Sequence, residues 1–304
     1  MAQIQSKEDA FGTFTEGHIP FAYNGETFQT YYKLYGTLEG RTRDPLVILH
    51  GGPGLIHRYL LPYADLYKTH NIPVILYDQI GNGQSTHLKE KPPTFWILDL
   101  FMDELDNLLE HFKIRDSFNL LGHSWGGVMG SEYAVTRQPP GLKHIILANS
   151  LASIALWIQS TMQLLQAFPP EVLEGIKVGM KDPAVYYEAL KIFHAKHGCI
   201  VKPTPREVVE TFEAVFGPEG DTTVSASPLL SGWSVIDRLH NVKASALVVN
   251  GIWDIGQDFV CAPFFYKIPK AKWVRFDDCS HMPHWENRER CMKIVGDFLT
   301  ADLE

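Results

Sequence analysis

The stretch Leu120-Leu121-Gly122-His123-Ser124-Trp125-Gly126-Gly127 decides the fold of this 304-residue chain. It follows a short apolar run at residues 118–121 and leads into a segment that predicts a helix beginning near Trp125. The pattern is G-x-S-x-G, in which a serine stands at the apex of a sharp turn from strand to helix, the nucleophile elbow. Gly122 and Gly126 suit this turn, because a β-carbon at either position would strike the neighbouring strand or helix. The stretch therefore predicts a nucleophilic Ser124 lifted above the end of a sheet.

Strands alternate with helices on both sides of this elbow. A continuous apolar run predicts a buried strand at residues 45–49, and a second buried strand is predicted at residues 72–77. Further strands are predicted at residues 143–148, 245–249 and 273–276. Apolar residues at helical spacing predict an amphipathic helix at residues 97–112, and a last helix is predicted at roughly residues 288–299. Near the amino terminus, Asn24-Gly25 joins two segments rich in Phe, Tyr and Thr, which is typical of a β-hairpin.

The alternation stops between residues 150 and 240, where the chain becomes mostly helical and rich in proline and aromatic residues. We therefore predict an α/β fold with a mainly parallel sheet flanked by helices. Residues 1–149 and 241–304 would form its core domain, and residues 150–240 an inserted helical lid.

Composition excludes several classes of function. The formal net charge of -8, with no basic patch, argues against binding to nucleic acid or to an anionic membrane. No stretch has the length of a signal peptide or a transmembrane helix, so we expect a soluble, cytoplasmic protein. The four cysteines lack C-x-x-C spacing, and we expect no disulfide framework, no metal and no cofactor.

A serine at an elbow needs a general base, and the base needs an orienting carboxylate, in the chain order Ser, Asp, His. The strand at residues 245–249 leads to Asp254, and the strand at residues 273–276 leads to His281. Because the carboxyl ends of parallel strands meet at one edge of a sheet, we predict Asp254 as the orienting acid and His281 as the base. The alternatives are Asp258, Asp277 and Asp278 for the acid and His284 for the base. We interpret His50 and His123 as hydrogen-bonded scaffold residues.

Acyl transfer also requires donors for the negative oxygen of the intermediate, the oxyanion hole. The amide that follows the nucleophile, that of Trp125, is one candidate. The loop His50-Gly51-Gly52-Pro53-Gly54 directly follows a predicted strand and offers unobstructed amides. We predict Gly52 as the second donor and place Gly51 among the substrate-binding residues.

Four motifs together resemble the proline iminopeptidase family, which includes tricorn-interacting aminopeptidases and related amino-acid amidases. They are His50-Gly51-Gly52-Pro53-Gly54, Tyr77-Asp78-Gln79-x-Gly81-x-Gly83-x-Ser85, Gly122-His123-Ser124-Trp125-Gly126-Gly127 and Cys279-Ser280-His281-Met282-x-x-x-Glu286. The similarity runs from about residue 13 to residue 299 and includes the lid. It implies the α/β-hydrolase fold and the cleavage of an N-terminal residue or a small amide by Ser124, His281 and Asp254.

The sequence departs from this family where the substrate's amine is bound. Family aminopeptidases hold the free ammonium with two glutamates, one directly after the catalytic aspartate and one in a lid motif of the form G-P-x-E-F. Here Ile255 occupies the first position, and the lid reads Gly217-Pro218-Glu219-Gly220-Asp221. Glu219 or Asp221 is left as a substitute carboxylate, and we count Glu219 and Ile255 among the substrate-binding residues.

Three functions follow from these observations. The first is a serine hydrolase acting on an ester, lactone or amide of a small, largely apolar molecule. The second is a proline iminopeptidase-like aminopeptidase or amino-acid amidase with a rebuilt amine site, whose partner would be a short peptide. The third is a non-hydrolytic use of the fold, as a lyase, a cyclase or a ligand receptor. The sequence does not distinguish oligomeric states.

Overall fold

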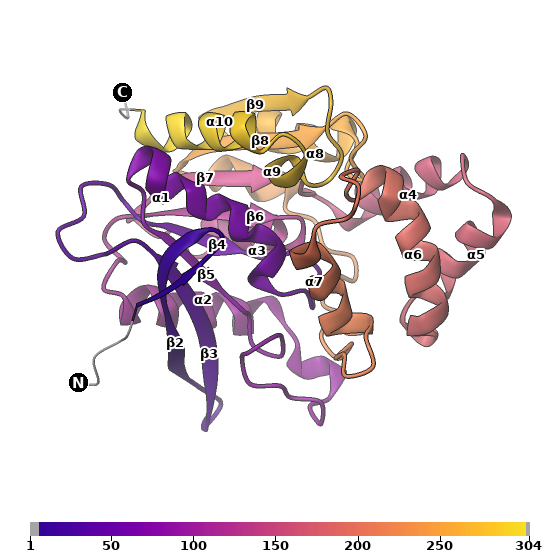
Figure 1. Ribbon diagram of the computed structural model, residues 1–304, viewed down its shortest axis with the longest axis horizontal. Helices are drawn as coiled ribbons and strands as arrows, with labels where there is room; N and C mark the ends of the chain where they lie inside the picture. Colours follow the sequence, from indigo (N-terminus) through magenta and orange to yellow (C-terminus); the bar gives the residue numbers. More distant parts are fainter. Residues whose placement is uncertain (1–5, 302–304) are drawn as a thin grey trace.

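A single sheet of nine strands organises residues 6–301, the part of the chain that the computed structural model describes (Figure 1). Its strand order is β1-β2-β3-β5-β4-β6-β7-β8-β9. The first three strands and the β3–β5 pair are antiparallel, whereas every pair from β5 to β9 is parallel. The mainly parallel sheet expected from the sequence is therefore confirmed.

The strands are β1 (Lys7–Asp9), β2 (Gly12–Tyr23), β3 (Glu26–Tyr35), β4 (Leu46–Leu49), β5 (Val74–Tyr77), β6 (Phe118–His123), β7 (Leu142–Ala148), β8 (Ser245–Gly251) and β9 (Ala271–Phe276). The α-helices are α1 (Asp65–His70), α2 (Leu98–His111), α3 (Trp125–Thr136), α4 (Ile154–Leu165), α5 (Pro170–Val178), α6 (Pro183–His197), α7 (Arg206–Phe216), α8 (Asp258–Lys267), α9 (Pro283–Glu286) and α10 (Arg288–Thr300). Short 3-10 helices are η1 (His57–Ala64), η2 (Pro93–Phe95), η3 (Gly179–Lys181) and η4 (Ile236–Asn241).

The hairpin of β2 and β3 turns at Asn24-Gly25, as predicted. Both residues have positive φ, 50° and 81°, which is the requirement of a type I′ turn. The sequence analysis did not predict β1, α1 or α8. Strand β1 is only three residues long, and α8 contains Pro263, so the sequence signals for these two elements are weak.

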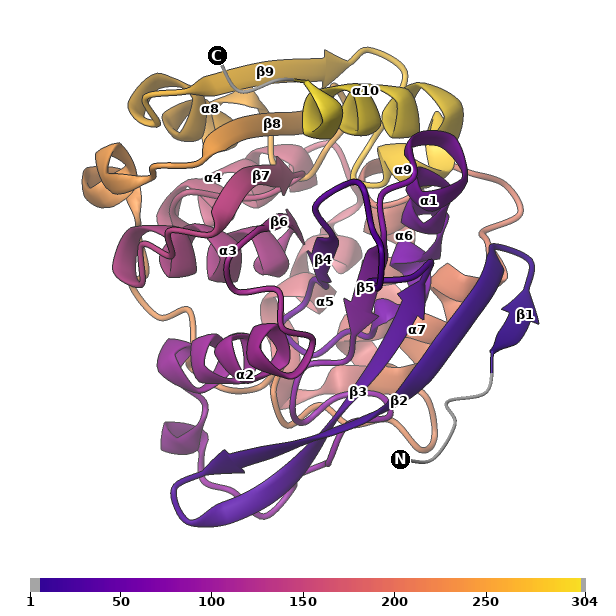
Figure 2. The ribbon, with the colours of Figure 1, turned by 90° about the vertical axis from the view of Figure 1, so that its left-hand side faces the viewer.

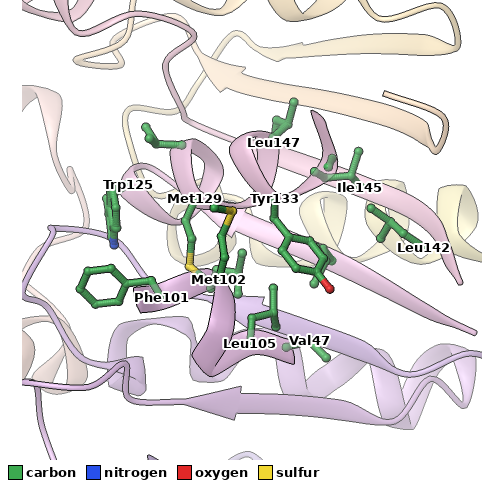
Figure 3. Close-up of a cluster of buried hydrophobic side chains, with 14 of the residues drawn as sticks. Val47, Phe101, Met102, Leu105, Trp125, Met129, Tyr133, Leu142, Ile145 and Leu147 are labelled. Atoms are coloured by element: carbon green, nitrogen blue, oxygen red, sulfur yellow. The ribbon is translucent and has the colours of Figure 1, made fainter. Parts of the chain in front are cut away.

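Alternate residues of the central strands face two hydrophobic layers. In β4, Val47 and Leu49 belong to one buried cluster, whereas Leu46 and Ile48 belong to the other. Helices α2 and α3 cover the first face, and helices α1 and α10 cover the second (Figure 2). Figure 3 shows the first layer, where Phe101 and Trp125 lie close to Met129. Burial on both faces explains why these strands read as continuous apolar runs.

Helices α4 to α7 all lie between β7 and β8 in the chain, and Figure 1 places them beyond one end of the sheet. The two ends of this segment are joined at a narrow neck. The amide of Ile154 donates to the Trp233 carbonyl at 3.1 Å, and the amide of Val235 donates to the Ala152 carbonyl at 3.0 Å. The chain thus leaves the core and returns to it at adjacent points.

All four cysteines are free and buried. Among residues 6–301, no helix combines the length and the apolar character that crossing a membrane requires.

Candidate active site

Ser124 stands between β6 and α3 in a backbone conformation that is unusual for a residue other than glycine. Its φ is 55° and its ψ is -119°. A β-carbon at Gly122 would lie 2.2 Å from the Gly126 carbonyl oxygen, and one at Gly126 would lie 2.0 Å from the Leu49 carbonyl oxygen. Only glycine fits at either position, so the structure has the tight strained turn that the sequence predicts. Trp125 is the first residue of α3, so its amide has no partner within the helix.

His281 and Asp254 lie at the ends of adjacent strands and contact each other. The distance from His281 Nδ1 to Asp254 Oδ1 is 2.6 Å. Both side chains are buried, and that of Asp254 is fully enclosed. A carboxylate on Nδ1 fixes the proton there and leaves Nε2 to act as a proton acceptor.

Two further donors hold the Asp254 carboxylate. The amide of Gly256 donates to Oδ1 at 3.0 Å, and the side-chain amide of Asn149 donates to Oδ2 at 2.7 Å. Asn149 follows β7 directly and also donates to the Ser280 carbonyl at 3.2 Å. A buried carboxylate needs such hydrogen-bond donors to replace the water that it loses on burial.

The alternative acids have other partners. Asp258 accepts bonds from Asn250 and Arg275, at 2.9 Å in each case, and Asp277 accepts from Arg275 at 3.2 Å. Asp278 accepts from Asn287 at 2.7 Å.

The alternative base, His284, lies beneath the site. Its Nε2 donates to the Tyr59 carbonyl at 3.1 Å, and its ring stacks on Tyr63. Burial lowers the pKa of His284 to about 3, so this imidazole stays neutral. His284 does not line the cavity that contains Ser124.

His50 is hydrogen-bonded within the scaffold, as the sequence predicts. Its Nε2 accepts from the Gln79 amide at 3.0 Å, so Nδ1 carries the proton and donates to the Gly51 carbonyl at 3.0 Å. Burial lowers the pKa of His50 to about 4. Gln79 also accepts from the Trp125 indole at 2.8 Å and so braces the start of α3.

The loop after β4 contains both predicted glycines. Gly52 has φ of 119°, and a β-carbon there would lie 2.5 Å from the Gly54 amide nitrogen. Gly52 lines the cavity beside Ser124. Gly51 is buried, and its amide donates to the Tyr59 hydroxyl at 2.8 Å. This amide therefore holds the loop in place. It is not among the cavity-lining residues.

A cavity of about 210 Å³ contains both Ser124 and His281. Ile255 and Gly52 contribute to its wall from the core, and Trp157, Tyr186 and Phe212 are among the residues that the α4–α7 segment contributes. Its polar side chains are serines, tyrosines and histidines, and none of the Asp or Glu residues that the structure describes lines it. The cavity is therefore suited to an uncharged, largely apolar ligand.

Glu219 and Asp221 lie outside this cavity. The Glu219 side chain is exposed. Asp221 is buried, where it contacts His87 Nδ1 at 2.6 Å and accepts from Thr223. Burial by itself would raise the pKa of Asp221, but the hydrogen bonds from His87 and Thr223 hold it below its usual range. The structure therefore does not bring Glu219 together with the other predicted site residues.

Sequence reasoning missed several residues of the site. Asn149 is the clearest case, since a polar residue directly after a buried parallel strand was a signal that could have found it. Ser160 on α4 donates to the Ile255 carbonyl, and His197 on α6 contacts the Trp253 carbonyl at 2.7 Å. These two carbonyls flank Asp254, and no local pattern connects residues so distant in the chain.

Comparison with known proteins places this arrangement in a class. The model of the alpha/beta hydrolase family matches residues 46–294. The chain is similar to a proline iminopeptidase of Clostridioides difficile (strain 630), with 33% identity over 300 residues, 95% of this chain and 99% of that relative. Among solved structures it is similar to VinJ, with a TM-score of 0.84 and 36% identity over 93% of this chain and 97% of that one. It is also similar to the proline iminopeptidase of Mycobacterium smegmatis, with a TM-score of 0.81 and 32% identity over the same shares.

These matches define an alpha/beta hydrolase. The similarity to the curated relatives extends over nearly the whole chain. Within that class the chain belongs to the proline iminopeptidase family, and it is a hydrolase enzyme.

Proposed function

We propose that the protein is a serine hydrolase that cleaves an ester, lactone or amide of a small, largely apolar substrate. One observation carries this proposal. Ser124 and His281 line the same cavity, and His281 is hydrogen-bonded to a buried aspartate, Asp254. A nucleophile, a base and an orienting acid are the three groups that covalent acyl transfer needs.

The proposed reaction begins when His281 Nε2 takes the proton of the Ser124 hydroxyl, whose oxygen attacks the substrate carbonyl. The Trp125 and Gly52 amides then stabilise the negative oxygen of the tetrahedral intermediate. His281 returns the proton to the leaving group, and an acyl-enzyme remains on Ser124. Water, activated by the same imidazole, releases the acid product and restores the serine.

Residues 150–240 form the proposed lid over this chemistry. Trp157 of α4, Leu190 of α6 and Val215 of α7 line the cavity together with Ser124. Ser225 also donates to the Pro53 carbonyl at 2.7 Å, next to the proposed oxyanion donor Gly52. A roof of this kind excludes water and selects the substrate.

The charge of the cavity favours a neutral acyl group. A buried ammonium requires a carboxylate partner, and its absence costs several kcal/mol. Ile255 is buried in the cavity wall. Its hydrocarbon side chain accepts no hydrogen bond and carries no charge. Asp221 is held by His87, so a free α-amine would have no partner in this arrangement.

The second candidate function is that of an aminopeptidase or amino-acid amidase acting on a short peptide or a small amide. It is favoured by the relatives named proline iminopeptidase, at 33% and 31% identity. It requires a lid movement that brings Asp221 or Glu219 toward Ser124.

A paired kinetic measurement distinguishes the two candidates. We compare kcat/KM for one amino-acid ester with a free α-amine and for its N-acylated form. The proposed function predicts equal or faster cleavage of the N-acylated ester. A tenfold preference for the free amine, about 1.4 kcal/mol of transition-state binding, would support the aminopeptidase instead.

Labelling with a fluorophosphonate tests the chemistry itself. The reagent should modify Ser124 in the wild-type protein and leave the Ser124→Ala variant unlabelled. If Ser124 stays unmodified in the folded wild-type protein, the hydrolase proposal fails and a non-hydrolytic role replaces it.

A further inference from the structure

A second cavity, of about 240 Å³, lies between α6 and α7. Tyr187 and Ala195 of α6 and Val208 and Val209 of α7 line this cavity and not the one that contains Ser124. Most of its wall is apolar, and the exposed residues Lys191, Lys202 and Thr204 also line it. Within residues 6–301 no Asp or Glu lines it. We call it the α6–α7 cavity.

Four residues line both cavities, namely Leu190, His194, Phe212 and Met282. The two spaces are therefore neighbours that share one wall. The rings of His194 and Phe212 lie 5.1 Å apart, edge to face. Burial, together with the nearby His281, lowers the pKa of His194 to about 3, so the imidazole is uncharged. A wall made of a neutral imidazole, a thioether, a leucine and a phenyl ring is compatible with an apolar chain beside it.

The shared wall lies on the side of the catalytic site where the leaving group departs. Met282 directly follows His281 in the sequence. In the proposed mechanism His281 protonates the leaving group, so the leaving group must lie beside this imidazole. The oxyanion donors Gly52 and Trp125 come from other loops.

We propose that the natural substrate is elongated and that an apolar arm of its leaving group extends past His194 and Met282 into the α6–α7 cavity. This inference rests on the proposed function for its orientation. The arm is an alkyl or similarly apolar group on the alcohol or amine side of the scissile bond.

The volume of the cavity sets the length of the arm. A space of about 240 Å³ holds roughly eight groups of the size of a water molecule. An alkyl arm of roughly eight carbons would therefore fill it. Each methylene group moved out of water strengthens binding by at most about fourfold, at about 0.8 kcal/mol per group.

A series of acetate esters tests the arm. We measure acid release from acetates of linear alcohols, from ethyl to decyl, each below its solubility limit. In the wild-type protein, kcat/KM for octyl acetate should exceed that for ethyl acetate by at least tenfold. Tryptophan at Ala195 would occupy the cavity, so the Ala195→Trp variant should reduce this octyl-to-ethyl ratio by tenfold or more. The Ala195 side chain is exposed at the cavity edge, so the fold should tolerate the substitution.

Ile192→Trp is the matched control. Ile192 lies on the same helix, is 52% exposed and lines neither cavity. It should keep the wild-type ratio. An unchanged ratio in Ala195→Trp, or no dependence on length in the wild-type protein, would overturn the inference.

A binding measurement tests the arm independently of turnover. In the Ser124→Ala background, 1-octanol should raise Tm more than ethanol does, and Ala195→Trp should abolish the difference while Ile192→Trp keeps it. If fluorophosphonate leaves Ser124 unlabelled and 1-octanol still gives this pattern, the hydrolase proposal fails and the cavity assignment stands. If Ser124 is labelled and 1-octanol stabilises all variants equally, the cavity assignment fails alone.

Discussion

His123 and His281 are joined by a hydrogen bond of 2.8 Å from His123 Nε2 to the His281 backbone carbonyl. The direction follows from the rest of the network. The Tyr59 hydroxyl accepts from the Gly51 amide at 2.8 Å and therefore donates to His123 Nδ1, at 2.9 Å. Nδ1 is thus an acceptor and Nε2 carries the proton. Burial lowers the pKa of His123 well below its usual value, in agreement with a neutral ring.

This network links the glycine loop to the proposed base through Tyr59, and it gives a first prediction. Tyr59→Phe should leave the Gly51 amide and His123 Nδ1 without their partner, which costs about 1–3 kcal/mol of unfolding free energy. It should also lower kcat by about tenfold or more with a smaller change in KM, because the base and the loop lose their common support. Chemical denaturation and steady-state kinetics measure the two effects.

Tyr63→Phe is the control, because Tyr63 lies in the same helix η1 but contacts neither Gly51 nor His123 by a hydrogen bond. It should keep kcat. A Tyr59→Phe variant with wild-type kcat would show that the network supports the fold only.

The second prediction assigns the catalytic roles. Ser124→Ala and His281→Gln should each reduce kcat by about 10³-fold or more, because residues that act as one unit fail together. His284→Gln should retain far more activity, since its ring is buried beneath the site and bonded to the Tyr59 carbonyl. Kinetics of the three purified variants on one ester, with Tm as the check of folding, provide the measurement. Inactivity of His284→Gln alone would reverse the assignment.

The predictions from sequence that succeeded have strong local causes. Glycine is required at Gly122 and Gly126 because a β-carbon there would lie only 2.2 Å and 2.0 Å from backbone carbonyl oxygens, so the elbow is encoded within five residues. The contact between Asp254 and His281, at 2.6 Å, was predictable because the carboxyl ends of parallel strands gather at one edge of a sheet, whereas their catalytic roles stay predictions. Predicting where each of these two residues lies required only the position of the strand end before it.

The missed features depend on contacts between distant parts of the chain. Asn149 reaches Asp254 across 105 positions, and Tyr59 reaches His123 across 64. Glu219 was chosen by its place after Gly217-Pro218, but its side chain is exposed while Asp221 is drawn to His87. Which of these two carboxylates is buried depends on His87, which lies in the loop after β5. The sequence around residues 217–221 contains no signal for that contact.

The third prediction concerns Glu104 on α2, a fully buried carboxyl group. Burial raises its pKa to about 8, although it accepts hydrogen bonds from Thr30 at 2.6 Å and from the Ile80 amide at 2.9 Å. A raised folded-state pKa means that the folded protein binds a proton that the unfolded chain has released. The stabilisation is complete below the unfolded pKa of about 4.5 and is lost as pH rises through about 8.

Glu104→Gln should therefore remove this loss. Its unfolding free energy should match the wild type near pH 5 and exceed it by pH 8–9, with a difference that grows by on the order of 1 kcal/mol per pH unit. Glu110→Gln, at an exposed position of the same helix, should follow the wild-type curve. Denaturant titrations at several pH values measure this, and parallel curves for Glu104→Gln and wild type would contradict the raised pKa.

The fourth prediction is that Glu132 of α3 holds the proposed lid, residues 150–240, against the core. This carboxylate accepts from Arg238 Nη2 at 2.7 Å and from the Trp233 indole at 3.0 Å, where the chain returns to the core. Burial alone would raise the pKa of Glu132, but the Arg238 bond holds it below its usual range. Glu132→Gln should lower the free energy of unfolding by about 1–3 kcal/mol and increase proteolysis within residues 150–240. Unchanged proteolysis would show that the neck is held by its backbone bonds alone.

The last prediction concerns Ile255, whose side chain lines the cavity and packs in a small apolar cluster with Leu165 and Phe193. Ile255→Glu places a carboxylate directly after Asp254, and a carboxylate within about 4 Å of an ammonium offsets part of its desolvation. The variant should raise kcat/KM for the free-amine ester relative to the N-acylated ester by at least tenfold, or about 1.4 kcal/mol.

Ile255→Gln is the matched control, because it introduces a polar side chain of the same length without the charge. Both variants should lose stability, since each buries a polar group in that cluster. Only the glutamate should change the preference for the amine. Its effect should increase with pH while the substrate's amine stays protonated, because burial raises the pKa of a carboxyl group and higher pH restores the charge. Equal preferences in the two variants would show that an ammonium cannot approach position 255.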